Sequence, residues 1–340
     1  MTKQESQMMK GVAILLMIFL HLFNQDINVA ECHNLVFINN TPLVHILSRA
    51  ASPVSFFLIL GGYGLYTVYS KGDRHRWSRL GKLYIHYWII LLIFLTVGCL
   101  IRPETYPGSF SNILSNFTSY HTTYNGEMWF LLPYAMLSAL SPYFFRLMAK
   151  FKAIYVIAIT LFLHLCTSWL ISSYGISFLF HNYWIYDPLL IIHLLFSFSL
   201  GAMAAREEFF KKLKNKCSQL QHKKYAWCVL ILLVIINCIF KYNFFYAFGV
   251  ICCLLIIGLP PFVKIILVKL GDQSMNMWMI HTWFCYYLFH DFIYSFSYPI
   301  IIFIVLVVIS YLMSLIINKI AIPVERIFLN RKEIKEKPIL

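Results

Sequence analysis

Long apolar runs separated by short polar segments occupy almost all of the 340-residue chain. A membrane-spanning helix needs about 20 mostly apolar residues, and each of these runs is close to that length. The predicted spans are roughly 9–26, 50–70, 83–101, 128–148, 153–172, 184–205, 225–240, 244–264, 273–291 and 298–320. The predicted fold is therefore an all-α, polytopic integral membrane bundle with about ten transmembrane helices.

The basic residues gather on one side of this predicted bundle. When the N-terminus is placed in the cytoplasm, only Arg49, Arg102 and Lys241 of the 28 Lys and Arg residues fall on the opposite side. Cytoplasmic loops of membrane proteins collect Lys and Arg. A missing or additional span would move every later loop to the wrong side, so the pattern predicts that both termini are cytoplasmic.

Composition narrows the class of protein further. Hydrophobic residues make up 60% of the chain and charged residues 12%, whereas a soluble domain carries roughly 25% charged residues. The net charge of +14 arises from short clusters between apolar runs. Membrane lipid, and not nucleic acid, is therefore the expected partner. The nine cysteines lack a paired Cys-x-x-Cys spacing, so neither a metal site nor a disulfide framework is expected.

His21 interrupts the apolar run of the first predicted span. An ionisable residue inside a membrane helix is costly and is therefore a functional candidate. Lys10 lies eleven residues earlier, which places both side chains on one helix face about 16 Å apart along the axis. A cation at the cytoplasmic mouth and a base deeper in the membrane would suit a long ligand with an anionic head, such as acyl-CoA. Two simpler alternatives are that His21 bonds a neighbouring helix and that Lys10 only anchors the topology.

The second connecting segment carries five basic residues. Arg76 and Arg79 are three residues apart, so they would be neighbours on a helix. Guanidinium groups bind phosphates bidentately, and Lys82 adds another cation to the segment. The loop is thus a candidate phosphate-binding site, with a simple positive-inside signal as the alternative.

Six short segments, spread in order over nearly the whole chain, make up a further pattern. They are Lys10 through His21, Phe56 through Tyr63, Arg76 through Arg79, Met128 through Leu131, Leu270 through His281, and Glu325-Arg326. In this combination the chain resembles the membrane acyltransferase 3 family. It departs from the family pattern at Lys10, where arginine is common, and at Gly61, where serine precedes glycine.

The resemblance implies a single integral membrane acyltransferase-like domain over residues 1–340, located in the cytoplasmic (inner) membrane of a bacterium. The implied reaction transfers an acyl group, usually acetyl, from acetyl-CoA as donor substrate to a hydroxyl of a cell-envelope glycan or lipid-linked saccharide. The family's histidine corresponds to His21, as general base or acyl carrier. The residues expected at acyl-CoA are Lys10, Arg76, Arg79 and Lys82.

Further candidates for the acceptor side or a secondary role are His281, Glu127, Trp129 and Ser274. With a ninth helix starting near Asp272, His281 would lie about 14 Å into the membrane, where it lines the acceptor path, orients His21 or only makes an interhelical hydrogen bond. Glu127 and Trp129 begin the fourth span at the outer face. There the indole could stack on a sugar or belong to the aromatic belt.

Two functions from other classes remain open. A transporter or flippase of lipid-linked glycan often has inverted repeats with broken helices, and no convincing repeat is visible in this chain. A polysaccharide polymerase would place a large charged loop on the outside, whereas the outer loops here are nearly free of Lys and Arg. Neither function uses CoA, so binding of acetyl-CoA distinguishes them from an acyltransferase.

Overall fold

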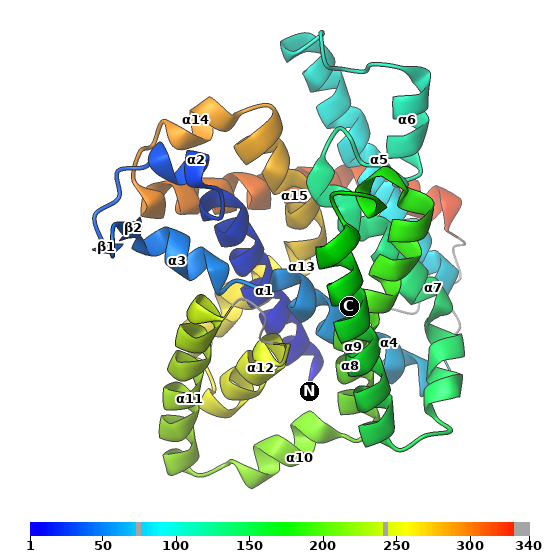
Figure 1. Ribbon diagram of the computed structural model, residues 1–340, viewed down its shortest axis with the longest axis vertical. Helices are drawn as coiled ribbons and strands as arrows, with labels where there is room; N and C mark the ends of the chain where they lie inside the picture. Colours follow the sequence, from blue (N-terminus) through cyan, green and yellow to red (C-terminus); the bar gives the residue numbers. More distant parts are fainter. Residues whose placement is uncertain (73–75, 241–243, 330–340) are drawn as a thin grey trace.

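The computed structural model describes residues 1–72, 76–240 and 244–329, which form a bundle of helices with one small hairpin (Figure 1). The helices are α1 (Lys3–Phe23), α2 (Asp26–Ala30), α3 (Leu43–Arg49), α4 (Pro53–Tyr69), α5 (Arg76–Ile101), α6 (Phe110–Phe117), α7 (Leu131–Met148), α8 (Ala153–Tyr174), α9 (Tyr183–Arg206), α10 (Phe209–Lys216), α11 (Leu220–Ile239), α12 (Tyr246–Ile257), α13 (Pro261–Thr282), α14 (His290–Tyr294) and α15 (Pro299–Phe328). Shorter turns are Gly126–Phe130, Leu179–His181 and Trp283–Tyr287, and the strands are β1 (Phe37–Ile38) and β2 (Thr41–Pro42). The predicted all-α membrane fold is confirmed. Lys241, used above to assign sides, lies outside the described residues.

Eight helical segments of the described chain are long and apolar enough to cross a membrane. They correspond to eight of the predicted spans. The other two predicted spans correspond to α12, which has 12 residues, and to α13, which has 22 residues. α13 carries Lys264 and Lys269 in its first half and Asp272, Gln273 and Asn276 in its second, so polar residues interrupt its apolar run.

The boundary between α12 and α13 differs from the prediction. α12 ends at Ile257, because Gly258 takes a φ of 67°, and Pro261 opens α13 in its first turn. Glycine with positive φ commonly ends a helix, and proline is pre-organised for a first turn. The prediction that the ninth helix starts near Asp272 was wrong. His281 lies in the last turn of α13, about 30 Å from its start by the helical rise.

Contacts between loops agree with the predicted sides of the membrane. In Figure 1, α10 lies at the bottom, whereas α2, α6 and α14 lie towards the top. At the α10 end, Lys214 Nζ is 2.7 Å from Glu5 Oε1, and the N-terminal ammonium donates to Tyr63 Oη at 2.8 Å. At the α2 end, His290 Nδ1 is 3.8 Å from Glu31 Oε2. The two ion pairs join segments that the charge pattern assigns to the same side, and the ammonium contact reaches Tyr63 inside the second predicted span.

Glycines set the two closest helix crossings of the bundle. α1 with α13 and α4 with α9 are the most extensively packed pairs among the described elements. Between α4 and α9, a Cβ atom added to Gly62 would stand 2.0 Å from a backbone oxygen of the opposite helix, and one added to Gly201 would stand 1.9 Å from such an oxygen. Between α1 and α13, the corresponding distances are 2.0 Å for Gly11 and 1.9 Å for Gly271. Small residues allow such close backbone approach in membranes. The crossing of α1 and α13 fixes the two helices that carry His21 and His281.

Candidate active site

His21 lies in the last turn of α1 within a group of ionisable and aromatic side chains. Its Nδ1 is 3.7 Å from Glu127 Oε2, and its ring centroid is 5.1 Å from that of His281. The Tyr286 ring centroid is 5.7 Å away, and the Tyr286 hydroxyl donates to the His21 backbone carbonyl. These four residues form what we call the His21 cluster. It brings together three residues predicted from separate parts of the sequence.

His281 is fully buried in this cluster. Its Nδ1 lies 2.8 Å from the Trp278 carbonyl oxygen and 3.1 Å from that of Met277. Because a carbonyl only accepts, Nδ1 carries the hydrogen and Nε2 is left with its lone pair. Nε2 has no hydrogen-bond partner among the described atoms. The interhelical bond considered for His281 is not what the structure shows, because both carbonyls belong to its own helix.

The segment before Glu127 is attached to the end of α13. The side-chain amide of Asn125 donates to Thr282 Oγ1 at 2.9 Å and accepts from the same hydroxyl at 3.0 Å. The amide of Gly126 donates to Tyr287 Oη at 2.8 Å. The Asn125–Thr282 pair is buried and reciprocally bonded, and such a pair stiffens the backbone around it. Glu127 is therefore held against His21 by contacts that span more than 150 residues of sequence.

A cavity of about 610 Å³ opens between α1, α4, α5 and α13. Its cationic lining residues are Lys3, Lys10, Lys71 and Arg79. Ser274 also lines it, with its hydroxyl donating to the Gly271 carbonyl at 2.8 Å. Three residues predicted from the sequence, Lys10, Arg79 and Ser274, thus meet in one hollow. We call it the basic cavity.

Two aromatic rings of the basic cavity lie close in sequence to members of the His21 cluster. Phe130 and Trp278 both line the cavity, and their ring centroids are 5.6 Å apart. Phe130 follows Glu127 by three residues, and Trp278 precedes His281 by three. Each ring is therefore about one helical turn from a member of the cluster. The cavity and the cluster are neighbours along the same helices.

Three predicted site residues belong neither to the basic cavity nor to the His21 cluster. The Arg76 guanidinium stands over the rings of Trp77 and Tyr143, at 5.1 and 5.5 Å from their centroids. The Trp129 side chain is exposed and packs edge-on against Phe130. Lys82 is turned towards α15, where it meets a carboxylate. These residues do not share the cavity with Lys10 and Arg79.

Lys82 belongs to a polar network that ties α5, α13 and α15 together. Its Nζ is 3.4 Å from Glu325 Oε2, while Glu325 Oε1 is 2.6 Å from His86 Nε2. His86 Nδ1 is in turn 2.7 Å from Asn276 Oδ1, and Asn276 donates to Asn318 Oδ1 at 3.1 Å. Paired polar groups thus join the three helices. The contacts of Lys82, His86 and Glu325 give these residues a role in holding the helices together.

Sequence reasoning missed Tyr286 and the aromatic pair of Phe130 and Trp278 as parts of the site. Tyr286 lies in the π-helical turn Trp283–Tyr287, and such turns are frequent at functional sites. A π-helical turn has no residue spacing by which it can be recognised in a single sequence. Phe130 and Trp278 are two among 60 aromatic residues, so their position at the end of the basic cavity became visible only in the folded chain.

The fold and the His21 cluster define a polytopic membrane protein with an ionisable site inside its helix bundle. A family model described as an acyltransferase domain matches residues 4–319. The chain therefore belongs to the acyltransferase 3 family and is an acyltransferase of the membrane. Searches among curated proteins and among solved structures found no match.

Proposed function

We propose that this protein transfers an acetyl group from cytoplasmic acetyl-CoA to a hydroxyl of a cell-envelope glycan or lipid-linked saccharide, in the inner membrane of a bacterium. One observation carries the proposal. A cation-lined cavity adjoins the N-terminal end of α1, and a histidine–carboxylate pair lies about one helical turn beyond its far end. A flippase or a polymerase of lipid-linked glycan would also meet phosphate, but it would not bind acetyl-CoA, so donor binding distinguishes these functions from acyl transfer.

The donor enters the basic cavity with its phosphates towards the cations. Lys3, Lys71 and Arg79 neutralise the phosphate groups, and Arg79 adds the planar fork that matches phosphate oxygens. Apolar and aromatic side chains, among them Phe57 and Tyr134, line the rest of the cavity and accept the pantetheine arm. The thioester then reaches Phe130 and Trp278, next to the His21 cluster.

His21 acts as the general base in direct transfer. The acceptor hydroxyl oxygen attacks the thioester carbonyl while His21 Nε2 takes the hydroxyl proton. The carbon–sulfur bond breaks, and the CoA thiolate receives that proton from the imidazolium. The Glu127 carboxylate, 3.7 Å from Nδ1, stabilises the imidazolium in between. The aromatic surroundings limit hydrolysis of the thioester by excluding water.

An acyl-histidine relay uses the same residues in two steps. A His21 nitrogen attacks the thioester carbonyl and the CoA thiolate leaves. The acceptor hydroxyl then attacks the acyl-imidazole, and Glu127 takes its proton. Incubation of the purified protein with acetyl-labelled CoA, without acceptor, separates the two routes. Label that stays on His21 indicates the relay, and unlabelled protein indicates direct transfer.

Arg79→Ala is expected to weaken acetyl-CoA binding by about tenfold or more, because a charged hydrogen bond to phosphate is lost. Arg76→Ala is the matched control, since Arg76 lies over Trp77 and Tyr143 outside the cavity lining. Isothermal titration calorimetry on detergent-purified protein gives both affinities. Equal losses in the two variants would remove the basic cavity as the donor site. A wild-type protein that does not bind acetyl-CoA at millimolar concentration would reject the proposed function.

Glu127→Gln is expected to lower kcat by about 10²-fold with an unchanged KM for acetyl-CoA. The amide keeps the shape of the side chain but no longer stabilises a charged imidazole. Glu31→Gln is the control, because Glu31 also lies near a histidine, His290, but on the outer loops. Steady-state transfer of radiolabelled acetyl to membrane glycan measures both variants. A rise in KM with unchanged kcat would place Glu127 in binding and not in proton transfer.

A further inference from the structure

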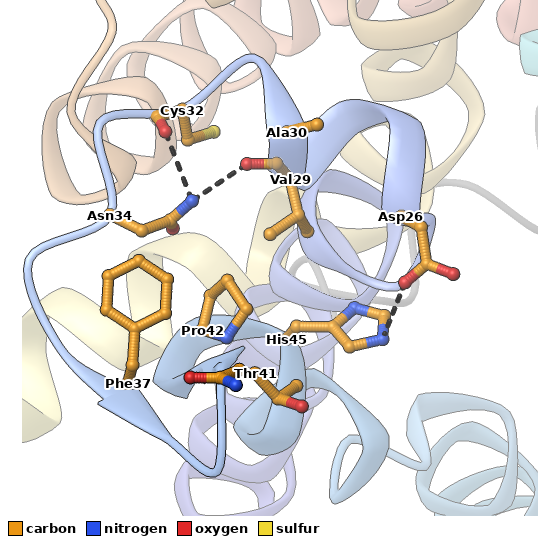
Figure 2. Close-up of a pocket in the computed structure, with 10 residues that line it drawn as sticks. Asp26, Val29, Ala30, Cys32, Asn34, Phe37, Thr41, Pro42 and His45 are labelled. Carbon is orange, nitrogen blue, oxygen red and sulfur yellow. Dashed lines mark hydrogen bonds and ion pairs between the residues drawn. The ribbon is translucent and has the colours of Figure 1, made fainter.

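A second hollow lies on the outer side of the bundle, away from the basic cavity. It has a volume of about 520 Å³ and is built from α2, the β1–β2 hairpin and α3. Figure 2 shows the side chains of Asn34, Phe37 and His45 around it, with Asp26 beside His45. We call it the outer pocket. The proposed chemistry assigns no role to it.

The outer pocket adjoins the end of α1, the helix that carries His21. His45 Nδ1 donates to the Phe23 carbonyl at 2.8 Å, and Ser48 Oγ donates to the same oxygen at 3.0 Å. These bonds attach α3, which carries His45 of the pocket lining, to the last turn of α1. Only five residue steps separate His21 from Asp26, so their Cα atoms lie within about 18 Å of each other.

The outer pocket is lined by both polar and apolar side chains, and Asp26 is its carboxylate. The amide nitrogen of Asn34 donates to the carbonyls of Val29 at 2.8 Å and Cys32 at 3.1 Å, which leaves its buried Oδ1 without a partner. The Asp26 side chain is 97% exposed, with Oδ1 3.2 Å from His45 Nε2. Asn40 and Thr41 add an amide and a hydroxyl. The carboxylate and amide oxygens accept from saccharide hydroxyls, and the Asn40 amide and the Thr41 hydroxyl can also donate to them.

One aromatic ring stands at this pocket. Phe37 is 54% exposed although it lines the hollow. The hairpin holds it in place, because Asn39 and Asn40 both have positive φ values, of 46° and 62°, as a tight two-residue turn of β1 onto β2 requires. A ring fixed in this way offers an apolar face to one side of a sugar.

Other occupants fit the outer pocket less well. An anionic headgroup or free phosphate would meet the exposed carboxylate of Asp26. The described residues contain no cluster of three or more His, Cys, Asp and Glu side chains that could hold a metal ion. Burial and the nearby Glu31 carboxylate raise the pKa of the Cys32 thiol to about 11. The pocket therefore presents no thiolate at neutral pH, and its chemistry is that of binding.

We infer that the outer pocket binds a neutral saccharide unit of the acceptor that is not itself acylated, and so presents the next unit of the glycan to His21. The inference rests on the proposed function for the identity of the acceptor. The pocket would act as a specificity site, because binding energy from a remote part of the substrate positions the reacting hydroxyl.

The test compares Phe37→Ala with Leu35→Ala. Leu35 is 80% exposed on the same segment and does not line the pocket. The probe is a set of acetyl-free oligosaccharides, prepared by alkali treatment and mild acid hydrolysis of envelope glycan from the producing cells. Phe37→Ala is expected to weaken probe binding by about tenfold and to raise the acceptor KM equally, with KM for acetyl-CoA unchanged. Leu35→Ala is expected to match wild type.

Asp26→Asn gives a second, independent measurement. It is expected to weaken probe binding by about tenfold, because a charged hydrogen bond becomes a neutral one. Equal probe affinity in wild type and Phe37→Ala, or competition by inorganic phosphate that strengthens in Asp26→Asn, would overturn the inference. The proposed function can fail separately. If the protein binds the oligosaccharides in a way that depends on Phe37 but does not bind acetyl-CoA, the outer pocket remains a saccharide site and the acetyl transfer is rejected.

Discussion

His21→Ala is expected to lower the rate of acyl transfer by about 10²–10⁴-fold, because the base that takes the acceptor proton is lost. The same variant is expected to bind acetyl-CoA with wild-type affinity, since His21 does not line the basic cavity. The rate is measured as transfer of radiolabelled acetyl to membrane glycan, and the affinity by calorimetry. The loss should therefore appear in kcat and not in donor binding.

His181→Ala is the control for this variant. His181 is exposed in the short turn Leu179–His181, so its removal tests a histidine of the same protein outside the His21 cluster. It should leave both rate and affinity unchanged. A His21→Ala protein that transfers acetyl at the wild-type rate would exclude direct transfer and the acyl-histidine relay together, because the first needs His21 as base and the second needs it as nucleophile.

Gly62→Ala is expected to destabilise the bundle by at least about 3 kcal/mol, the upper range for overpacked cores. The added methyl group would stand 2.0 Å from the Phe198 carbonyl oxygen, so α4 and α9 would have to separate along their crossing. Such a loss is a large part of the total stability of a domain, about 5–15 kcal/mol. Thermal unfolding followed by size-exclusion chromatography in detergent measures it.

Gly64→Ala is the matched control, two residues further along α4. A Cβ atom at Gly64 would meet nothing within 4 Å, and alanine is a better helix former than glycine by about 1 kcal/mol. This variant should be as stable as wild type or slightly more so. Only stability is compared, since Gly64 lines the basic cavity. Equal stability of the two variants would mean that the α4–α9 crossing is not as close as described.

Much of the architecture could be predicted from local sequence. The lengths of the apolar runs predicted an all-α membrane bundle, which was confirmed. The one-sided distribution of basic residues predicted the orientation of the bundle, which stays a prediction. The exception was the boundary at Gly258, because the apolar run 244–264 continues through the end of α12 and into α13. Mean hydropathy averages over this boundary, so it could not reveal it. The positive φ of Gly258 ends α12, and Pro261 begins α13.

The candidate site could be predicted only in part. His21 was visible because an ionisable side chain in an apolar run is costly. Lys10, Arg79 and Lys82 were equivalent as basic residues near cytoplasmic helix ends, and the sequence could not separate them. In the folded chain, Arg79 lines the basic cavity, whereas Lys82 faces Glu325. Glu325 is more than 200 residues away from Lys82 in the sequence.

Side of the membrane and approximate helix length are local properties of this chain, because the cost of burying charge and the gain from burying apolar surface are set residue by residue. The meeting of His21 with Glu127 and His281 is not local. It depends on the close crossing of α1 and α13 at Gly11 and Gly271 and on the long-range attachment of the segment before Glu127. Such contacts form between helices that are far apart in sequence, so only the tertiary packing of the helices determines which side chains meet.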